Sequence, residues 1–97
     1  ILAIDDVVTA GTAVRESVDF IENHGASLCA FCVAVDRQER GQEGTGSALA
    51  ELSETFQLVP ISIVTLDDIL AFAADDPRIA KDVAPRIEEY RAQYGAL

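Results

Sequence analysis

The amino-acid sequence predicts an α/β fold in which βαβ units build a parallel sheet that carries helices on its faces. Three short apolar segments alternate along the chain with stretches in which apolar residues recur at the period of a helix. The chain has 97 residues, of which 49% are hydrophobic and 25% are charged, and its mean hydropathy is +0.20. This composition and length are ordinary for one globular core, and two cores would need a longer chain.

The first strand and the first helix are predicted from the opening quarter of the chain. Residues 1–4 form an apolar run typical of a buried strand, which should end at Asp5 and Asp6. A helix is predicted from Ala13, and Gly25 should end it because glycine readily adopts the left-handed conformation after a last helical turn. The expected core face of this helix is Val14, Val18 and Ile21, widened by Ala13, Ser17 and Phe20.

Two more strands are predicted downstream. The apolar run over 28–35 indicates a strand buried on both faces, and the charged, glycine-rich segment over 36–47 indicates a loop. A short helix capped by Ser47 should lead to a third strand over 58–64. Pro60 lacks an amide hydrogen, so we expect it near the start of that strand or at a sheet edge.

The last part of the chain predicts two helices. Thr65 and Asp68 have the spacing of a capping box that opens a helix. Asp76 followed by Pro77 is typical of a helix start, and this last helix should end at Tyr94. If the first strand were central in a wider sheet, one of its edges would be unpaired in this chain.

Two pairs of side chains have spacings that suggest chemistry, but structural roles fit them better. Cys29 and Cys32 would point to opposite faces of a strand, so we interpret them as buried free thiols rather than as a redox pair or zinc site. Tyr90 and Tyr94 are four residues apart on the last helix, which favours a packing stripe over a platform for stacking bases.

The charge and hydropathy argue against several classes of partner. The formal net charge of −10 would repel a phosphate backbone, so we expect no nucleic acid as partner. No apolar stretch is long enough to span a membrane and no secretory signal opens the chain, so we expect a soluble cytoplasmic protein. Because the sequence begins without Met and inside an apolar run, we expect it to be a piece of a longer protein.

The segment Asp5–Ala13 carries the strongest chemical signal. It places two carboxylates at the carboxyl end of a parallel strand, where open α/β sheets bind ligands, and then a small-residue turn at a helix N-terminus. Carboxylates can accept hydrogen bonds from the vicinal hydroxyls of a sugar, and the turn amides, Gly11 and the hydroxyls of Thr9 and Thr12 can cradle an anion. An acidic pair before a helix is more often only a structural cap, so the pair by itself leaves both interpretations open.

The complete segment resembles the phosphoribosyl-diphosphate-binding motif of the type I phosphoribosyltransferases, with a hydrophobic strand, two acidic residues and a Thr-x-x-Thr phosphate loop in this order. Along essentially the whole chain, the segments 5–17, 25–26, 36–41 and 61–66 resemble the orotate phosphoribosyltransferase family. The segment DRQERG over 36–41 separates that family from purine-specific relatives. Residues 1–97 are thus interpreted as the carboxyl-terminal part of a phosphoribosyltransferase domain, with a partial parallel-sheet fold of that type.

The resemblance implies transfer of ribose 5-phosphate from phosphoribosyl diphosphate to orotate, which gives orotidine 5′-monophosphate and diphosphate in pyrimidine (UMP) synthesis. It implies catalytic roles for Asp5 and Asp6, with Mg²⁺ nearby held through substrate and water rather than by direct protein ligands. It places orotate at Thr9 and Arg37. The phosphoribosyl-diphosphate-binding residues that it implies are Asp5, Asp6, Val7, Val8, Thr9, Ala10, Gly11, Thr12 and Ala13.

The chemistry of arginine supports the orotate assignment, because a guanidinium offers a rigid fork of donors that suits a carboxylate. The residues alone favour a different arrangement, in which Arg37 and Arg40 form exposed ion pairs with Asp36, Glu39 or Glu43. The resemblance favours the orotate role for Arg37 only.

Cations for a polyanionic substrate are scarce, since residues 1–47 contain only Arg15, Arg37 and Arg40 and the sole lysine is Lys81. The family's chains are about twice as long, and their amino-terminal half carries a mobile loop rich in Lys and Arg that closes over a neighbour's active site. The resemblance therefore implies a homodimer formed through the full-length chain. We expect this chain alone to be inactive.

Other classes of protein fit the sequence less well. Response-regulator receiver domains also place an acidic pair after a first strand, but this sequence lacks the aspartate and lysine that they need after later strands. No Gly-x-Gly-x-x-Gly segment follows a predicted strand, which argues against a dinucleotide-binding module. The remaining alternative is a noncatalytic, nucleotide-sensing relative of the phosphoribosyltransferases, which the net charge and the Arg37 segment disfavour.

Overall fold

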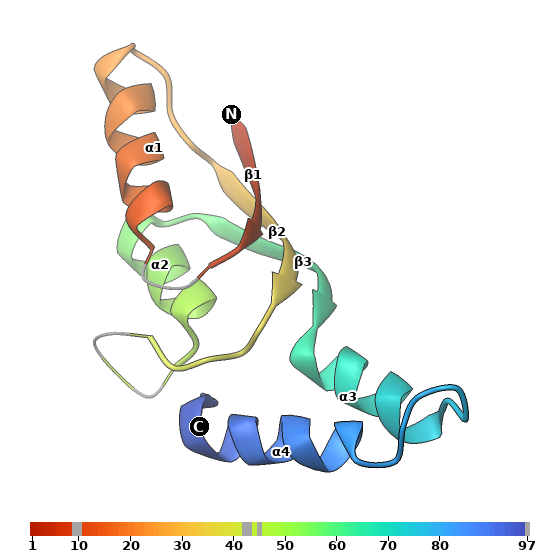
Figure 1. The fold of residues 1–97 in the computed structure, drawn as a ribbon. Coiled ribbons are helices and arrows are strands. Elements are labelled where there is room, and N and C mark those ends of the chain that lie inside the picture. The colour runs from red at the N-terminus through yellow and green to blue at the C-terminus, as the bar shows by residue number, and fades with distance from the viewer. Residues whose placement is uncertain (9–10, 42–43, 45, 97) are drawn as a thin grey trace.

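The computed structural model describes residues 1–8, 11–41, 44 and 46–96. In this part of the chain three strands alternate with helices, and a fourth helix follows the third (Figure 1). The elements are β1 (Leu2–Val7), α1 (Thr12–Asn23), β2 (Ala30–Asp36), α2 (Ala48–Phe56), β3 (Val59–Thr65), α3 (Leu66–Asp75) and α4 (Val83–Tyr94). The strands pair in the order β1-β2-β3 and both pairings are parallel, so the predicted α/β class is confirmed. Pro60 lies second in the edge strand β3, as expected.

The strand β1 extends further than predicted. Val7 pairs with Val35 of β2, so Asp5 and Asp6 lie inside the strand and not after it. The prediction was wrong because an apolar run marks burial, whereas the length of a strand is set by its hydrogen bonds to the neighbouring strand. Since side chains alternate along a strand, Asp5 and Asp6 point to opposite faces of the sheet.

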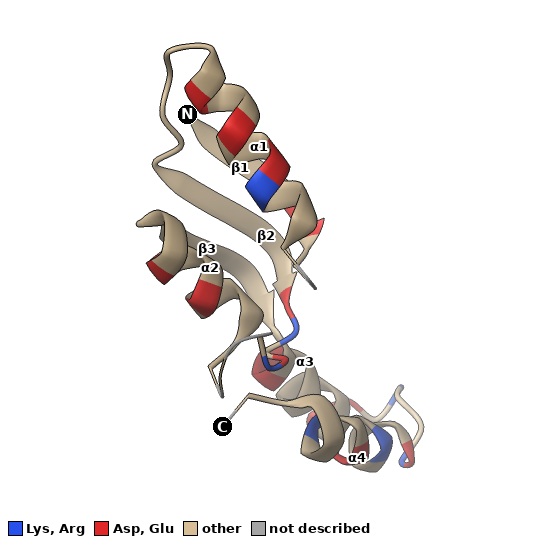
Figure 2. Ribbon diagram, turned by 90° about the vertical axis from the view of Figure 1, so that its left-hand side faces the viewer, with Lys and Arg blue, Asp and Glu red and all other residues tan. Residues whose placement is uncertain are grey.

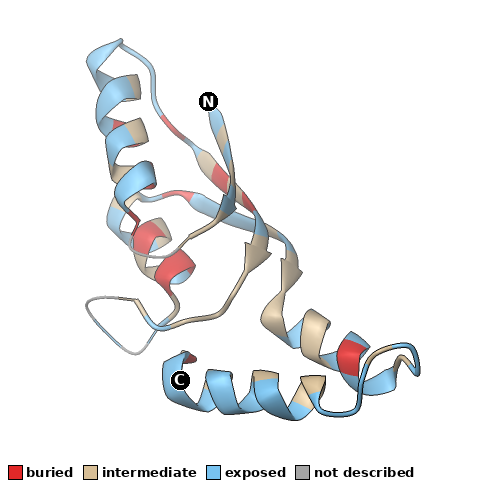
Figure 3. Ribbon diagram, in the orientation of Figure 1, coloured by how far each residue is buried: buried red, intermediate tan, exposed pale blue. Residues whose placement is uncertain are grey.

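The core lies between one face of the sheet and the helices α1 and α2 (Figure 3). Its buried members are Val14, Val18, Leu28, Phe31, Val33, Leu49, Leu52 and Leu58, so Val14 and Val18 face the core as predicted. Phe20, which was expected to widen this face of α1, is 66% exposed, and its ring lies 4.4 Å from the ring of His24. The apolar stripe of α1 is therefore narrower than its sequence indicates.

The opposite face of the sheet is open. In β2, Phe31 and Val33 are buried on the helix side, whereas Ala34 on the other side is exposed, so the prediction of a strand buried on both faces was wrong. Cys29 and Cys32 are free thiols as predicted, but Cys29 is exposed and Cys32 only half-buried. The open face carries exposed apolar side chains of the two outer strands, namely Leu2, Ile4, Val59, Ile61 and Ile63. Within the described residues the outer edge of β1 has no partner strand.

The ends of three helices confirm the predicted signals. Gly25, just beyond α1, has a left-handed φ of 77°. The Ser47 side chain accepts a hydrogen bond from the Ala50 amide at 3.2 Å and so caps α2. At the start of α3, the Asp68 amide donates to Thr65 Oγ1 at 3.2 Å and the Thr65 amide donates to Asp68 Oδ2 at 2.9 Å, which completes the capping box.

The last helix begins later than predicted. Asp76 accepts a hydrogen bond from the Arg78 amide at 2.8 Å and pairs with the Arg78 side chain at 2.6 Å, which fixes a turn after α3. The helix α4 starts only at Val83. The prediction from Asp76 and Pro77 was wrong because an aspartate that fixes a turn and one that caps a helix both accept bonds from amides a few residues ahead.

The helices α3 and α4 form a hairpin that projects from the end of β3 (Figure 1). This hairpin elongates the molecule, whose principal extents are 51, 26 and 16 Å. The radius of gyration is 15.3 Å, against about 13 Å for a compact chain of roughly 100 residues. In the described parts of the chain no helix combines the length and apolar character that crossing a membrane would need.

Candidate functional site

A pocket of about 250 Å³ lies where β1 ends and α1 begins. Its lining residues are Asp5, Val7, Val8, Gly11, Thr12, Ala13 and Val14. All of these except Val14 belong to the segment that the resemblance assigns to phosphoribosyl diphosphate. Asp6 does not line the pocket, and the predicted residues Thr9 and Ala10 lie outside the described residues.

The two aspartates differ in their surroundings. Asp5 is half-buried and faces the pocket, whereas Asp6 is exposed. The Asp6 amide donates to Asp5 Oδ1 at 2.8 Å, and the Val7 amide donates to Asp6 Oδ1 at 2.7 Å. The bond from Val7 favours the charged carboxylate and so lowers the pKa of Asp6 below its ordinary value of 3.8. At neutral pH Asp6 is therefore an acceptor and not a donor.

The N-terminus of α1 borders the pocket. Gly11 occupies the cap position with φ 77° and ψ 10°, and no side chain of the described residues caps the first turn of the helix. The first amides of a helix have no partner within the helix, and with the helix dipole they favour an anion. Gly11 also packs closely on α2, since a Cβ at this position would lie 2.7 Å from Leu52 Cδ2. The left-handed φ favours glycine, and a Cβ at this position would have to displace the Leu52 side chain.

The described residues that line the pocket include no Lys or Arg. Figure 2 shows Asp and Glu along α1. The sequence of this helix contains one basic residue. That residue, Arg15, lies over the ring of Phe56 at 5.5 Å from its centroid. Backbone amides alone can hold one phosphate, but a diphosphate would need cations from other parts of the protein.

Arg37 follows β2 at the same edge of the sheet as the pocket. The pairing of Val35 with Val7 sets the ends of the two strands side by side. Because the carboxyl ends of parallel strands meet at one edge, the segment after β2 and the pocket after β1 open on the same side of the sheet.

The side chains of Arg37, Glu39 and Tyr90 form a closed cluster. Arg37 Nη2 lies 2.5 Å from Glu39 Oε1 and donates to the Tyr90 hydroxyl at 2.7 Å. The Tyr90 hydroxyl donates to the same Glu39 oxygen at 2.5 Å. Of the ion pairs that the residues alone favoured, the pair of Arg37 with Glu39 is present, and α4 supplies Tyr90 as a third member of the cluster. Arg40 forms no ion pair with another described residue, and Glu43 lies outside the part of the chain that the structure describes. Among the described residues, no hydrogen bond involves Nε or Nη1 of Arg37, which leaves three N–H donors for a ligand.

Tyr90 was not predicted as part of this site. Its predicted contact with Tyr94 is confirmed, with 4.7 Å between the ring centroids. The sequence carries no signal for the bond between Tyr90 and Arg37, because the two residues are 53 positions apart. The hydrogen bond to Glu39 is the main cause that raises the pKa of Tyr90 above its ordinary value of 10.0, so the hydroxyl remains protonated and can donate.

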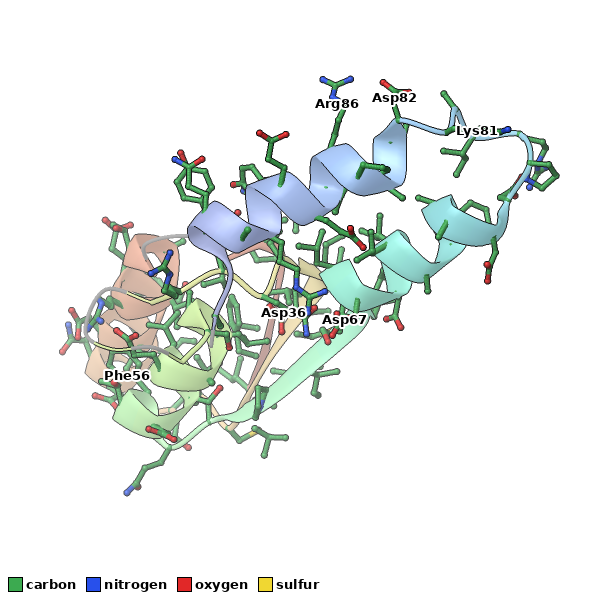
Figure 4. All side chains as sticks on the ribbon, turned by 90° about the horizontal axis from the view of Figure 1, so that it is seen from below. Asp36, Phe56, Asp67, Lys81, Asp82 and Arg86 are labelled. Atoms are coloured by element: carbon green, nitrogen blue, oxygen red, sulfur yellow. The ribbon has the colours of Figure 1, made fainter. Side chains whose placement is uncertain are left out.

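The loop after β2 is anchored to α3. Gln38 has a left-handed φ of 53°, and its amide donates to Asp36 Oδ1 at 2.9 Å. The Gln38 side chain accepts from the Asp67 amide at 2.9 Å and donates to the Asp67 carboxylate at 3.0 Å. Figure 4 shows Asp36 and Asp67 at this junction and Lys81 at the far end of the helical hairpin. The sole lysine therefore lies away from the loop.

The same loop is also anchored to the end of α4. The Arg40 amide donates to the Tyr94 carbonyl at 2.9 Å, and the Ala96 amide donates to the Gln38 carbonyl at 2.8 Å. The Arg40 side chain donates to the Gln93 carbonyl. The segment that carries Arg37 is therefore held by both helices of the hairpin, which the sequence did not predict.

The described residues contain no group of three or more His, Cys, Asp and Glu side chains that could hold a metal ion by themselves. Two carboxylates are adjacent in β1, and Mg²⁺ commonly uses one or two carboxylates together with substrate phosphates and water. The donor set present here therefore fits Mg²⁺ only when a substrate supplies further oxygens.

Comparisons with known proteins identify relatives along nearly the whole chain, although no protein-family model matches it. The chain is 47% identical over 95 residues to the orotate phosphoribosyltransferase of Laribacter hongkongensis. The matched residues cover 98% of this chain and 44% of that protein. It is 48% identical over 96 residues to the orotate phosphoribosyltransferase of Pseudomonas fluorescens, with the same shares.

A solved structure agrees with these relatives. The crystal structure of orotate phosphoribosyltransferase from Francisella tularensis superposes with a TM-score of 0.81 at 27% identity, covering 98% of this chain and 46% of that one. The chain thus spans less than half the length of the relatives that it matches. The predicted resemblance is confirmed: in sequence and in fold, this chain is similar along nearly its whole length to a part of orotate phosphoribosyltransferases.

Proposed function

We propose that the protein to which this chain belongs is an orotate phosphoribosyltransferase, which joins orotate to phosphoribosyl diphosphate and releases orotidine 5′-monophosphate and diphosphate. The observation that carries this proposal is the pocket at the end of β1, because six of its seven lining residues come from the segment Asp5–Ala13. The relatives at 47% and 48% identity bear the same name, which supports the reaction and the substrates.

Each part of the pocket suits one part of a sugar phosphate. The carboxylate of Asp5, which lines the pocket, would accept hydrogen bonds from the ribose hydroxyls. Asp6 lies next to the pocket but outside its lining, and it would contribute a second acceptor at this end of β1. The amides of Gly11, Thr12 and Ala13, which no described side chain caps, would hold the 5′-phosphate at the N-terminus of α1. Catalysis would then consist mainly of holding two substrates in a reactive geometry, with a ribosyl centre that develops positive charge next to carboxylates.

Arg37, and Thr9 in the segment outside the described residues, would bind orotate. The free donors on Nε and Nη1 of Arg37 suit the carboxylate or carbonyl oxygens of that substrate. Arg37 comes from the loop at the same edge of the sheet as the pocket, so both substrates would meet at this edge.

Magnesium would belong to this site together with the substrate. When bound, it would neutralise part of the negative charge of the diphosphate leaving group. Asp5 and Asp6 would hold its outer shell through water and the ribose, since the described residues offer no further cluster of ligands. The remaining cations would come from the rest of the protein or, in a homodimer, from a second subunit. We also propose that the protein acts in the cytoplasm and binds no nucleic acid.

The test is a steady-state assay of the whole protein with phosphoribosyl diphosphate, Mg²⁺ and orotate. We expect orotidine 5′-monophosphate as product and no product with hypoxanthine in place of orotate. Asp5→Asn combined with Asp6→Asn should lower kcat/KM on the order of 100-fold or more.

A matched control replaces two exposed acids on the outer side of α1. Asp19→Asn combined with Glu22→Gln changes the net charge equally and should leave the activity unchanged. Full activity of the Asp5 and Asp6 double variant would contradict the proposed roles. Binding of phosphoribosyl diphosphate without any turnover would instead favour a noncatalytic sensor.

A further inference from the structure

The cluster of Arg37, Glu39 and Tyr90 holds a guanidinium in one position. An exposed ion pair with a single carboxylate fixes an arginine poorly, because both side chains are flexible and many geometries satisfy the pair. Here a hydroxyl group closes the arrangement, since Tyr90 accepts from Arg37 Nη2 at 2.7 Å and donates to Glu39 Oε1 at 2.5 Å. The guanidinium carbon also lies 6.0 Å from the centroid of the Tyr90 ring, which limits its movement on that side.

The partner of Arg37 is itself held firmly. The Tyr90 ring packs on Tyr94 with 4.7 Å between centroids, and the Tyr94 carbonyl accepts a hydrogen bond from the Arg40 amide. The helix that carries Tyr90 is therefore tied at its end to the same loop that carries Arg37. A movement of α4 relative to this loop would change the position of the guanidinium.

We propose that Tyr90 is a positioning residue for orotate: its hydroxyl group orients the Arg37 guanidinium so that Nε and Nη1 remain free for the substrate. The inference rests on the proposed function and adds to it a residue of α4 that has no contact with the pocket. Tyr90 acts through Arg37, so its removal should weaken orotate binding and leave the binding of phosphoribosyl diphosphate intact.

The test is the variant Tyr90→Phe in the whole protein, which keeps the ring and removes only the hydroxyl group. We expect the KM for orotate to rise about 3- to 10-fold, as for the loss of one hydrogen bond. The KM for phosphoribosyl diphosphate and the melting temperature should stay unchanged, and kcat should change by less than about twofold.

Tyr94→Phe is the matched control, because it makes the same change four residues later and no described residue hydrogen-bonds to the Tyr94 hydroxyl. All constants of this variant should equal those of the unmodified protein. A second comparison uses Arg37→Ala alone and together with Tyr90→Phe. If Tyr90 acts through Arg37, the double variant should have the same KM for orotate as Arg37→Ala.

Three results would overturn the inference. An active Tyr90→Phe variant with an unchanged KM for orotate would exclude a positioning role. A rise of both KM values together with a lower melting temperature, or additive effects in the double variant, would assign Tyr90 a merely structural role. If the unmodified protein transfers no ribose 5-phosphate to orotate, the proposed function fails first and the inference fails with it.

Discussion

Gly11 couples the packing of two helices to the geometry of the proposed phosphate site. Its φ of 77° is unfavourable for any residue with a Cβ, and its close neighbour Leu52 belongs to the core. The conformation of this one residue therefore sets both how α1 approaches α2 and where the first amides of α1 point. A substitution here should affect stability and phosphate binding together.

We predict that Gly11→Ala destabilises the whole protein by more than the roughly 1–2 kcal/mol expected from left-handed strain alone, and that it raises the KM for phosphoribosyl diphosphate. Gly25→Ala is the control, since Gly25 has the same φ of 77° but a Cβ at this position would meet no other atom within 4 Å. Gly25→Ala should lower the stability through left-handed strain and leave the KM for phosphoribosyl diphosphate unchanged. Denaturant unfolding and initial rates measure both. If both variants lost the same stability and had the same KM for phosphoribosyl diphosphate, Gly11 would have no particular role in phosphate binding.

At the residue scale, the sequence predicted groups that are contiguous and missed those that the fold brings together. Asp5 to Ala13 could be identified because a strand end, a turn and a helix start are consecutive in the chain, and the pocket contains most of this segment. Tyr90 could not be identified, because its role depends on how α4 returns to the loop after β2. The opposite directions of Asp5 and Asp6 were missed for a related reason, since β1 continues through both residues.

The helix α3 starts directly at the end of β3, so its cap also fixes the base of the hairpin that holds the loop with Arg37. Thr65 is both the last residue of β3 and the N-cap of α3. The hydrogen bonds with Thr65 lower the pKa of Asp68 below its ordinary value of 3.8. Because the pKa is lowered on folding, Asp68 stabilises the folded state above pH 3.8, and this contribution is lost as the pH falls through the lower folded pKa.

We predict that Thr65→Ala lowers the free energy of unfolding of the whole protein by about 1 kcal/mol at neutral pH. Asp68→Asn should also destabilise it there, and its difference from the unmodified protein should disappear in acid, once Asp68 is protonated in both states. Asp75→Asn, at the other end of the same helix, is the control and should not destabilise. Urea unfolding at several pH values provides the measurement, and a pH-independent effect of Asp68→Asn would contradict the prediction.

At the element scale, the elements were predictable where local signals agree with the tertiary environment. The capping box and the glycine after α1 depend on neighbouring residues only, and both are present. Asp76 was ambiguous because turns and helix starts use the same hydrogen bond. Burial of β2 on both faces was predicted from its apolar run, but burial also requires a covering layer, and no described element covers the second face.

Across the described part of the chain, helices cover one face of the sheet, and the other face is exposed and apolar. Ile4 and Ile63 are 75% and 74% exposed there, and parallel sheets normally carry helices on both faces. The relatives are more than twice as long as the part that matches this chain. We therefore expect the remainder of the whole protein to cover this face and to supply the cations that the pocket lacks.

We predict that the isolated 97-residue chain forms no orotidine 5′-monophosphate under conditions in which the whole protein is active. The physical reason is that the lining residues described by the structure include no Lys or Arg for a diphosphate, and positioning of both substrates is the main source of catalysis. The assay compares the two proteins at equal molar concentration. Product formed by the purified 97-residue chain would show that this chain suffices for the transfer reaction and would contradict the prediction.

We propose that the pocket at the end of β1 binds the ribose 5-phosphate of the substrate. A crystal structure of the whole protein with phosphoribosyl diphosphate and Mg²⁺ tests it most directly. We predict ribose hydroxyls within hydrogen-bonding distance of Asp5 or Asp6, and the 5′-phosphate on the amides between Gly11 and Ala13. A substrate bound elsewhere, with these carboxylates and amides uninvolved, would contradict the claim.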